Sequence, residues 1–176
     1  VFMTQILHEI NLDYSDILIR PKMGINLNSR KDVNLQRLFK FKHGQTRTGL
    51  GIFNANMATV GNFDIAKKLL IKGMFATLHK HYSVDEIGGF IKESKKENIP
   101  LDNLFITIGL KNIDNEIEKL KELESKYQWK SPRNICIDAP NFYIQKALDV
   151  LMRVRHEFSD AVIMAGNIAS GDICLK

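Results

Sequence analysis

The chain has 176 residues, which suits one domain, or one domain with an arm, and leaves no room for two full domains. Hydrophobic residues make up 44% and charged residues 26% of the sequence, so the composition is that of a globular protein and excludes a disordered or collagen-like one. The net charge of +5 arises from 25 basic and 20 acidic residues that are interspersed along the chain. Because no basic block is present, we expect no nucleic-acid partner.

The apolar runs and the cysteines limit the cellular environment. The longest apolar runs, at residues 74–78 and 161–165, are far shorter than the roughly 18 residues that cross a bilayer, and no signal-peptide pattern opens the chain. Cys136 and Cys174 lie far apart and have no Cys or His neighbours at metal-ligand spacing, which excludes a disulfide framework and a zinc site. We expect a cytoplasmic protein without a membrane partner.

The first 49 residues differ from the rest of the chain. Residues 16–20 are a short strand candidate that Pro21 ends, and residues 22–49 are rich in Lys, Arg, Asn and Gln. We interpret residues 1–49 as an N-terminal arm and extension, and residues 50–176 as the beginning of the main domain.

From about residue 50 onward, short apolar segments alternate with longer amphipathic ones, which is typical of βα units around a parallel sheet. The expected strands are residues 51–54, 74–78, 104–108, 134–137 and 161–164. The expected helices are residues 63–71, 83–97, 113–127 and 143–158. Cap signals mark two helix starts, at Ser83 with Glu86 and at Asn112 with Asp114. Such units fit either a complete doubly wound sheet or the first part of a (β/α)8 barrel.

Groups that carry chemistry follow two of the expected strands, at the end where parallel strands place functional residues. The sequence HKHYS at residues 79–83 offers Lys80 for a phosphate and histidines that titrate near neutral pH, although a locally satisfied histidine pair with a helix cap is the alternative. Asp138 can accept hydrogen bonds from a ribose or an amide, or can cap the next helix with Pro140 in its first turn. Cys136 and Cys174 are interpreted as small buried side chains and not as nucleophiles.

A series of short motifs resembles the GMP reductase branch of the IMP dehydrogenase and GMP reductase family, in order and spacing along the whole chain. The motifs are DILIRPK at residues 16–22, SR at 29–30, ANM at 55–57, TVG at 59–61, HKHYS at 79–83, Asp138, and AGN at 165–167. The resemblance implies an α/β fold, the (β/α)8 TIM barrel, of which this chain supplies the arm and about the first five βα units. The HKHYS run and the lack of an inserted second domain favour the reductase branch.

The resemblance further implies NADPH-dependent reductive deamination of GMP to IMP and ammonia by a homotetramer. In the family, a cysteine thiolate attacks the purine carbon that bears the amino group, and hydride from NADPH resolves the covalent intermediate. By position, the cofactor-contacting residues are Ser29, Arg30, Lys80, Asp138, Ala139 and Pro140. Met57 matches the residue beside the purine. An arginine suits the 2′-phosphate of NADPH, because its guanidinium pairs with phosphate through two hydrogen bonds.

The chain also departs from the family pattern. Ala58 stands in place of an aspartate, and Pro140 and Phe142 stand where small residues let the cofactor lie close. The family's cysteine loop, which carries the nucleophile and is expected to hold a potassium ion, is not among these 176 residues. We therefore expect no catalytic residue in this chain and no activity from it alone. The alternatives are an IMP dehydrogenase-like oxidoreductase, or a decayed half-barrel that binds nucleotide or a homologue without catalysis.

Overall fold

The computed structural model describes residues 12–21, 23, 27–43, 46–129 and 134–171, and the chain divides into two compact units, residues 1–34 and 35–176. The described part of the first unit has two short 3-10 helices, η1 (Tyr14–Asp16) and η2 (Arg30–Asp32). The strand predicted at residues 16–20 is wrong, because residues 17–20 have no regular secondary structure. Leu18 is 98% exposed, so nothing described in this unit covers the apolar side chains that suggested a strand.

The second unit begins with a hairpin of two antiparallel strands, β1 (Arg37–Lys40) and β2 (Thr46–Gly49). The compact unit therefore starts at Leu35, earlier than the sequence-based boundary at residue 50. The hairpin is tied to the rest of the unit through the chain that follows it, where the Leu50 N–H donates to the carbonyl oxygen of Gly73 (2.8 Å). Gly49 packs so tightly that a Cβ atom there would lie 2.5 Å from the same oxygen.

Four parallel strands form the main sheet, in the spatial order β3-β4-β5-β6. These strands are β3 (Ala76–Thr77), β4 (Leu104–Ile108), β5 (Asn134–Asp138) and β6 (Val162–Gly166). Each strand pairs with the strand that follows it in the chain, and all the pairs are parallel. This sequential order is that of a barrel, whereas a doubly wound sheet reverses its order at a switch point.

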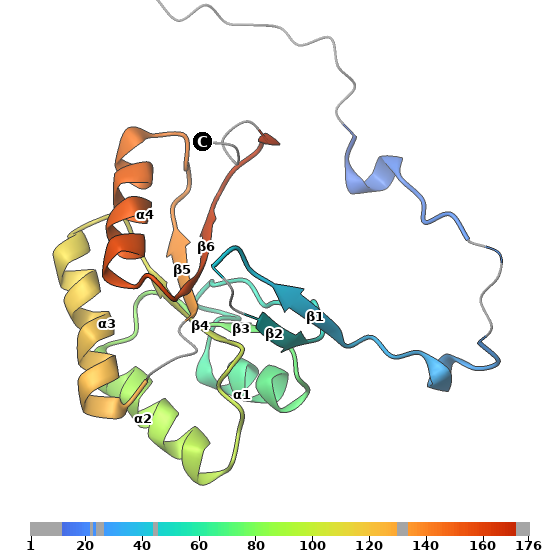
Figure 1. The fold of residues 1–176 in the computed structure, drawn as a ribbon, viewed down its shortest axis with the longest axis horizontal. Coiled ribbons are helices and arrows are strands. Elements are labelled where there is room, and N and C mark those ends of the chain that lie inside the picture. Colours follow the sequence, from blue (N-terminus) through green and yellow to red (C-terminus); the bar gives the residue numbers. More distant parts are fainter. Residues whose placement is uncertain (1–11, 22, 24–26, 44–45, 130–133, 172–176) are drawn as a thin grey trace, which may run out of the picture. The chain divides into compact units, whose positions relative to one another are not determined.

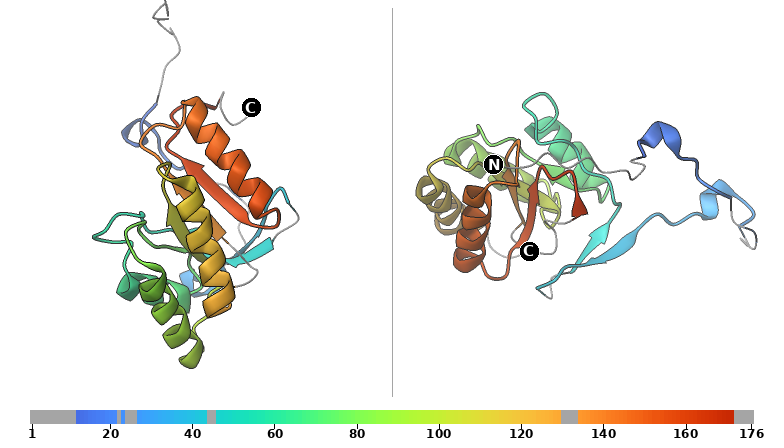
Figure 2. Two further views of the ribbon diagram at one scale, coloured as in Figure 1. Left: turned by 90° about the vertical axis from the view of Figure 1, so that its left-hand side faces the viewer. Right: turned by 90° about the horizontal axis from the view of Figure 1, so that it is seen from above.

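The helices follow the strands and lie along one face of the sheet, as Figure 1 and the turned views of Figure 2 show. They are α1 (Phe63–Ile71), α2 (Val84–Lys96), α3 (Ile113–Tyr127) and α4 (Gln145–Glu157). Their buried side chains form one core cluster with alternate strand residues such as Leu78, Ile106 and Ile137. In the described part of the chain, every helix is too short or too polar to cross a bilayer.

The opposite face of the sheet has a second, smaller cluster. It contains Phe75, Phe105, Cys136 and Val162 from the strands, with Phe39 and Phe41 from the hairpin packed against them. Among the described residues, helices therefore cover one face only, whereas a doubly wound sheet has helices on both. Together with the strand order, this identifies the α/β fold as part of a (β/α)8 barrel, which confirms the prediction.

The segment expected to be the first strand of the domain, residues 51–54, makes a single parallel bridge, from Phe53 to Phe75. The next bonds come from a side chain. The Asn54 amide donates to the carbonyl oxygen of Thr77 (2.8 Å), and the Asn54 Oδ1 accepts the N–H of the same residue (2.8 Å). Asn54 thus makes with its side chain the two hydrogen bonds that a peptide group makes in a sheet.

The predicted helix caps had different outcomes. The capping box of Ser83 and Glu86 is present at the start of α2. Asn112 is the residue before the first turn of α3, so the predicted helix start is confirmed, but its backbone is left-handed (φ 49°) and its side chain makes no cap bond. Helix α4 begins only at Gln145, so Pro140 is not in its first turn and Asp138 does not cap it.

Candidate functional site

A pocket of about 410 Å³ lies at the edge of the sheet where β5 and β6 end. Its volume falls within the range of small-molecule sites, roughly 300–1,000 Å³. The lining residues are Asn56, Cys136, Ile137, Asp138, Met164, Ala165, Gly166, Asn167 and Ile168. The C-terminal edge of the parallel strands is the position at which barrel enzymes bind their substrates.

An ion pair stands beside this pocket, between Lys80 Nζ and Asp138 Oδ2 (2.9 Å). Lys80 follows β3 and Asp138 ends β5, so the lysine side chain spans the end of β4. The Lys80 side chain passes Gly109, which follows β4: a Cβ atom there would lie 3.7 Å from Lys80 Cδ, an ordinary van der Waals contact. The two side chains are 35% and 27% exposed, so both charges remain accessible to a ligand. The structure thus brings together two residues that the sequence had placed in one site.

The histidines beside Lys80 are held by local contacts. The His79 ring stacks on Tyr82 (centroids 3.9 Å apart), and Tyr82 stacks on Phe63 at the same distance. His79 Nδ1 accepts the backbone N–H of His81 (3.2 Å). Partial burial, followed by the neighbouring His81, lowers the pKa of His79. His79 therefore favours its neutral form, in agreement with the alternative of a locally satisfied histidine pair.

Two charged residues of α3 lie beneath the turn that carries Lys80. Lys119 Nζ donates to the carbonyl oxygens of Tyr82 (2.7 Å) and Lys80 (3.4 Å). Burial lowers the pKa of Lys119 and raises the pKa of Glu116 one helical turn earlier. Sequence reasoning missed both residues, because polar side chains on an amphipathic helix are usually solvated.

The loop after residues 51–54 presents Asn56 to the pocket, while Met57 is not among the lining residues. The Met57 side chain is 62% exposed and so does not belong to the core. Its carbonyl oxygen accepts the N–H groups of Val60 (3.0 Å) and Gly61 (2.6 Å), which closes the loop. Gly61 approaches the backbone of β3 closely, because a Cβ atom there would lie 3.0 Å from the Thr77 carbonyl oxygen.

The residues after Asp138 pair with the end of β6. The Ala139 N–H donates to the Gly166 carbonyl oxygen (2.8 Å), and the Ala139 oxygen accepts the Asn167 N–H (2.6 Å). The Ala139 side chain is buried in the helix-side core, whereas Pro140 is exposed. Phe142 is also buried in that core, so its ring does not occupy the pocket.

The other predicted cofactor residues, Ser29 and Arg30, belong to the first unit. Ser29 precedes η2, and its hydroxyl oxygen accepts the Lys31 N–H (3.3 Å). The Asp32 carboxylate accepts the Ser29 N–H in return (3.0 Å), so the pair forms a capping box. Arg30 is the first residue of η2 and is exposed. Ser29 therefore has a local structural role, which sequence reasoning did not foresee.

Cys136 lines the pocket but lies within β5 on the inner face of the sheet. Burial raises the pKa of its thiol to about 11. A thiol with this pKa remains protonated at neutral pH and is a poor nucleophile. Cys174 lies outside the described residues. Within the described ranges, no group of three His, Cys, Asp or Glu side chains is arranged to hold a metal ion.

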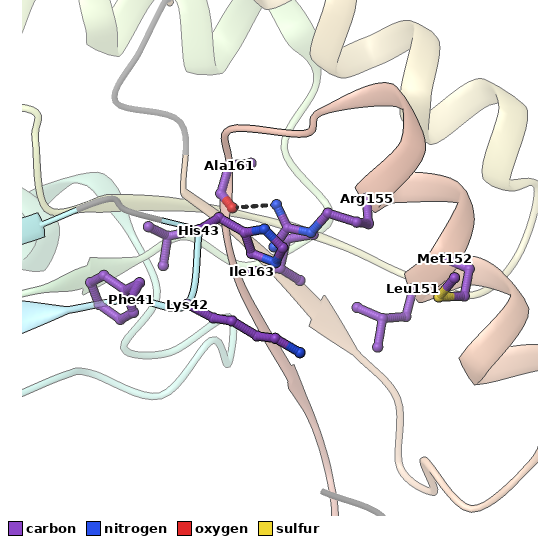
Figure 3. Close-up of a pocket in the computed structure, with 9 residues that line it drawn as sticks. Phe41, Lys42, His43, Leu151, Met152, Arg155, Ala161 and Ile163 are labelled. Atoms are coloured by element: carbon purple, nitrogen blue, oxygen red, sulfur yellow. Dashed lines mark hydrogen bonds between the residues drawn. The ribbon is translucent and has the colours of Figure 1, made fainter. Parts of the chain in front are cut away.

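A second pocket, of about 490 Å³, lies where β6 begins (Figure 3). Its lining residues are Phe41, Lys42, His43, Leu151, Met152, Arg155, Ala161, Val162 and Ile163. The Arg155 guanidinium donates to the Ala161 carbonyl oxygen (2.7 Å) and so joins the end of α4 to β6. This pocket lies at the edge of the sheet opposite to Asp138, where the parallel strands begin. The pocket beside Asp138 is therefore the better candidate site.

Comparisons with known proteins point to one family, although no protein-family model matches the chain. The chain is 38% identical to a GMP reductase of Vibrio parahaemolyticus over 94% of its length, and 36% identical to a GMP reductase of Onchocerca volvulus over 97%. It spans 46% of each of these relatives. Among solved structures, inosine 5′-monophosphate dehydrogenase of Legionella pneumophila shares the fold, with a TM-score of 0.65 and 23% identity over 89% of this chain and 44% of that one.

Proposed function

Since the chain belongs to the IMP dehydrogenase and GMP reductase family, we propose that it is part of a GMP reductase, which converts GMP to IMP and ammonia with NADPH. The relatives of 36–38% identity that carry this name support the proposal. The single structural observation that carries it is the Lys80–Asp138 pair beside the pocket at the C-terminal edge of the sheet.

The residues of this edge fit a phosphorylated, hydroxyl-rich ligand such as NADPH, which supplies hydride when bound. The Lys80 ammonium offers a point charge to a phosphate, and the Asp138 carboxylate accepts hydrogen bonds from hydroxyl or amide groups. Because both side chains are partly exposed, a ligand can reach them from solvent and replace the contact between them. In the first unit, the exposed Arg30 guanidinium suits a second phosphate, and in the main domain the exposed Met57 suits the purine.

The family chemistry requires a thiolate, and Cys136 does not supply one at neutral pH. The resemblance sets the family's cysteine loop outside residues 1–176, and we place the nucleophile there and not at Cys136 or Cys174. In this proposal the described residues bind and orient the cofactor, while residues elsewhere form and break the covalent bond. A homotetramer in the cytoplasm is part of the same proposal.

The test is an assay of the complete protein that contains these 176 residues. We expect NADPH to be consumed with GMP, and ammonia to be released in equal amount. Reduction of NAD⁺ with IMP would instead show an IMP dehydrogenase. Binding of nucleotide without either reaction would show a non-catalytic relative. Residues 1–176 expressed alone are expected to consume no NADPH, and steady consumption by this fragment would contradict the assignment of the nucleophile.

A further inference from the structure

We propose that Lys119 is a positioning residue for the Lys80–Asp138 pair: from helix α3 it holds the turn that aims Lys80 across the end of the sheet. The expected effect of Lys119 on NADPH binding rests on the proposed function. The structural part of the inference, the anchoring of the turn, stands on the contacts of Lys119 alone. Lys119 touches the backbone of the turn and not the ligand-facing charges, so its role is distinct from that of Lys80.

The contacts of Lys119 join two layers of the domain. Its ammonium donates to the carbonyl oxygens of Tyr82 (2.7 Å) and Lys80 (3.4 Å), which belong to the turn between β3 and α2. These carbonyls lie outside the strand and the helix, in a stretch with no regular secondary structure around the two-residue turn at Lys80 and His81. One side chain from a neighbouring helix therefore fixes both ends of a three-residue segment.

The burial of Lys119 points to a specific role. Within the described residues, the Lys119 ammonium makes no ion pair, and its hydrogen-bond partners are the two carbonyl oxygens of the turn. Burial lowers the pKa of Lys119, although the nearby carboxylates of Glu116 and Glu86 oppose this effect. Burying an ammonium is unfavourable unless hydrogen bonds compensate for the lost water. The carbonyls of the turn provide that compensation.

Other contacts hold the turn as well: His79 Nδ1 accepts the His81 N–H (3.2 Å), and Tyr82 stacks on Phe63 of α1. At its beginning, the His79 ring stacks on Tyr82, and at its end Ser83 starts the capping box of α2. Between them, the Lys80 side chain must cross Gly109 to reach Asp138. A displacement of about 1 Å in such a segment changes the alignment of a charged group with its ligand considerably. Lys119 supports the residue from which that crossing begins.

The test compares three lysine variants in the complete protein. Lys119→Met removes the donor but keeps the length of the side chain, and we expect KM for NADPH to rise on the order of tenfold, with kcat within about threefold of its original value. Lys119→Arg keeps hydrogen-bond donors within reach of the two carbonyls, so we expect its KM for NADPH to stay close to the original value. Lys121→Met is the matched control, because Lys121 lies on the same helix and pairs with Glu157 at the surface (2.6 Å).

A second measurement separates this inference from the proposed function. Hydrogen exchange at residues 79–83 should become faster in Lys119→Met and remain unchanged in Lys121→Met. If the unmodified protein neither binds nor oxidises NADPH while this difference in exchange persists, the proposed function fails and the anchoring stands. If NADPH is oxidised normally and exchange and KM are unaffected by Lys119→Met, the inference is overturned. Should Lys119→Met not fold, Lys119→Gln is expected to raise KM similarly, and an unchanged KM in that variant would overturn the inference.

Discussion

The two ends of the parallel sheet are built from the same strands but in opposite ways. Where the strands begin, Phe75 stacks on Phe53 (4.4 Å) and meets Phe39 edge-on (5.4 Å), and the buried Arg47 is hydrogen-bonded to Asn134. Where the strands end, Lys80 and Asp138 remain partly exposed beside an open pocket. At the first end, the protein itself supplies the packing and hydrogen-bond partners of these side chains. At the second end, charged groups remain available to a ligand. Changes at the first end should therefore alter stability, and changes at the second should alter binding.

The largest effect is expected from Phe75→Ala at the beginning of the strands. Phe75 is fully buried among three other phenylalanine rings, so its loss leaves a cavity and should lower the free energy of unfolding by about 3–5 kcal/mol. Urea unfolding measures this change. Met57→Ala, an exposed side chain at the other end, serves as the control and should cost less than about 0.5 kcal/mol. Equal losses in both variants would remove the distinction between the two ends.

The next largest loss of stability is expected from Asn134→Ala. It removes the acceptor for Arg47 Nε (3.2 Å) and Nη2 (3.1 Å) and leaves the guanidinium buried, at a cost of about 3 kcal/mol. The double variant Arg47→Met with Asn134→Ala should lose less than the sum of the single changes, because the guanidinium that Asn134 binds is removed as well. Strict additivity in urea unfolding would show that the two side chains do not depend on each other.

Cys136 lies between the two ends of the sheet, and the reactivity of its thiol measures its exposure to solvent. Its pKa of about 11, raised from 9.0 by burial, means roughly 100-fold less thiolate than an exposed cysteine has near neutral pH. Alkylation by iodoacetamide at about pH 8 should therefore be slower by that factor in the folded protein than in urea. Mass spectrometry of the peptide that contains Cys136 gives its rate separately from that of Cys174. Rapid alkylation of the folded protein would place this thiol in the solvated part of the site.

Lys80→Ala should change binding and leave folding almost intact. The loss of one charge-assisted contact is worth about 1.5–3 kcal/mol, or roughly a 10- to 150-fold weaker affinity for NADPH. Lys67→Ala is the matched control, because Lys67 forms a comparable pair with Glu97 on the surface away from the pocket. Calorimetric titration of both variants gives the affinities, and a thermal melt gives the stabilities. A lower melting temperature with unchanged affinity would make Lys80 a structural residue.

Much of the architecture could be predicted, because it follows from local patterns. The bounds of α1, α3 and β4 agree with the expected ranges, because helical spacing and a fully apolar strand can each be recognised from one segment of sequence. Lys80 and Asp138 could be assigned to one site because both follow strands of a parallel sheet. Their contact across Gly109 depends on the strand order β3-β4-β5, which the fold had to supply.

The features that escaped prediction depend on residues far away in the sequence. Arg47 is in a segment rich in polar residues, and only its partner, Asn134 on β5, makes it part of the buried structure. The role of Asn54 depends on Thr77, and that of Lys119 on the carbonyls of Lys80 and Tyr82. In each case a polar side chain bonds to a group on another element, and hydrophobic periodicity carries no information about such bonds.

The bond between Arg47 and Asn134 joins residues that are 87 positions apart. During synthesis at about 5–20 residues per second, Arg47 is made roughly 4–17 s before its acceptor exists. Asn54 and Thr77 are only 23 positions apart, so their contact can form within a few seconds of translation. The hairpin is thus made early, whereas the acceptor of its arginine is made much later. For that interval Arg47 cannot form its bonds to Asn134, and its guanidinium is left to water or to whatever else binds a nascent chain.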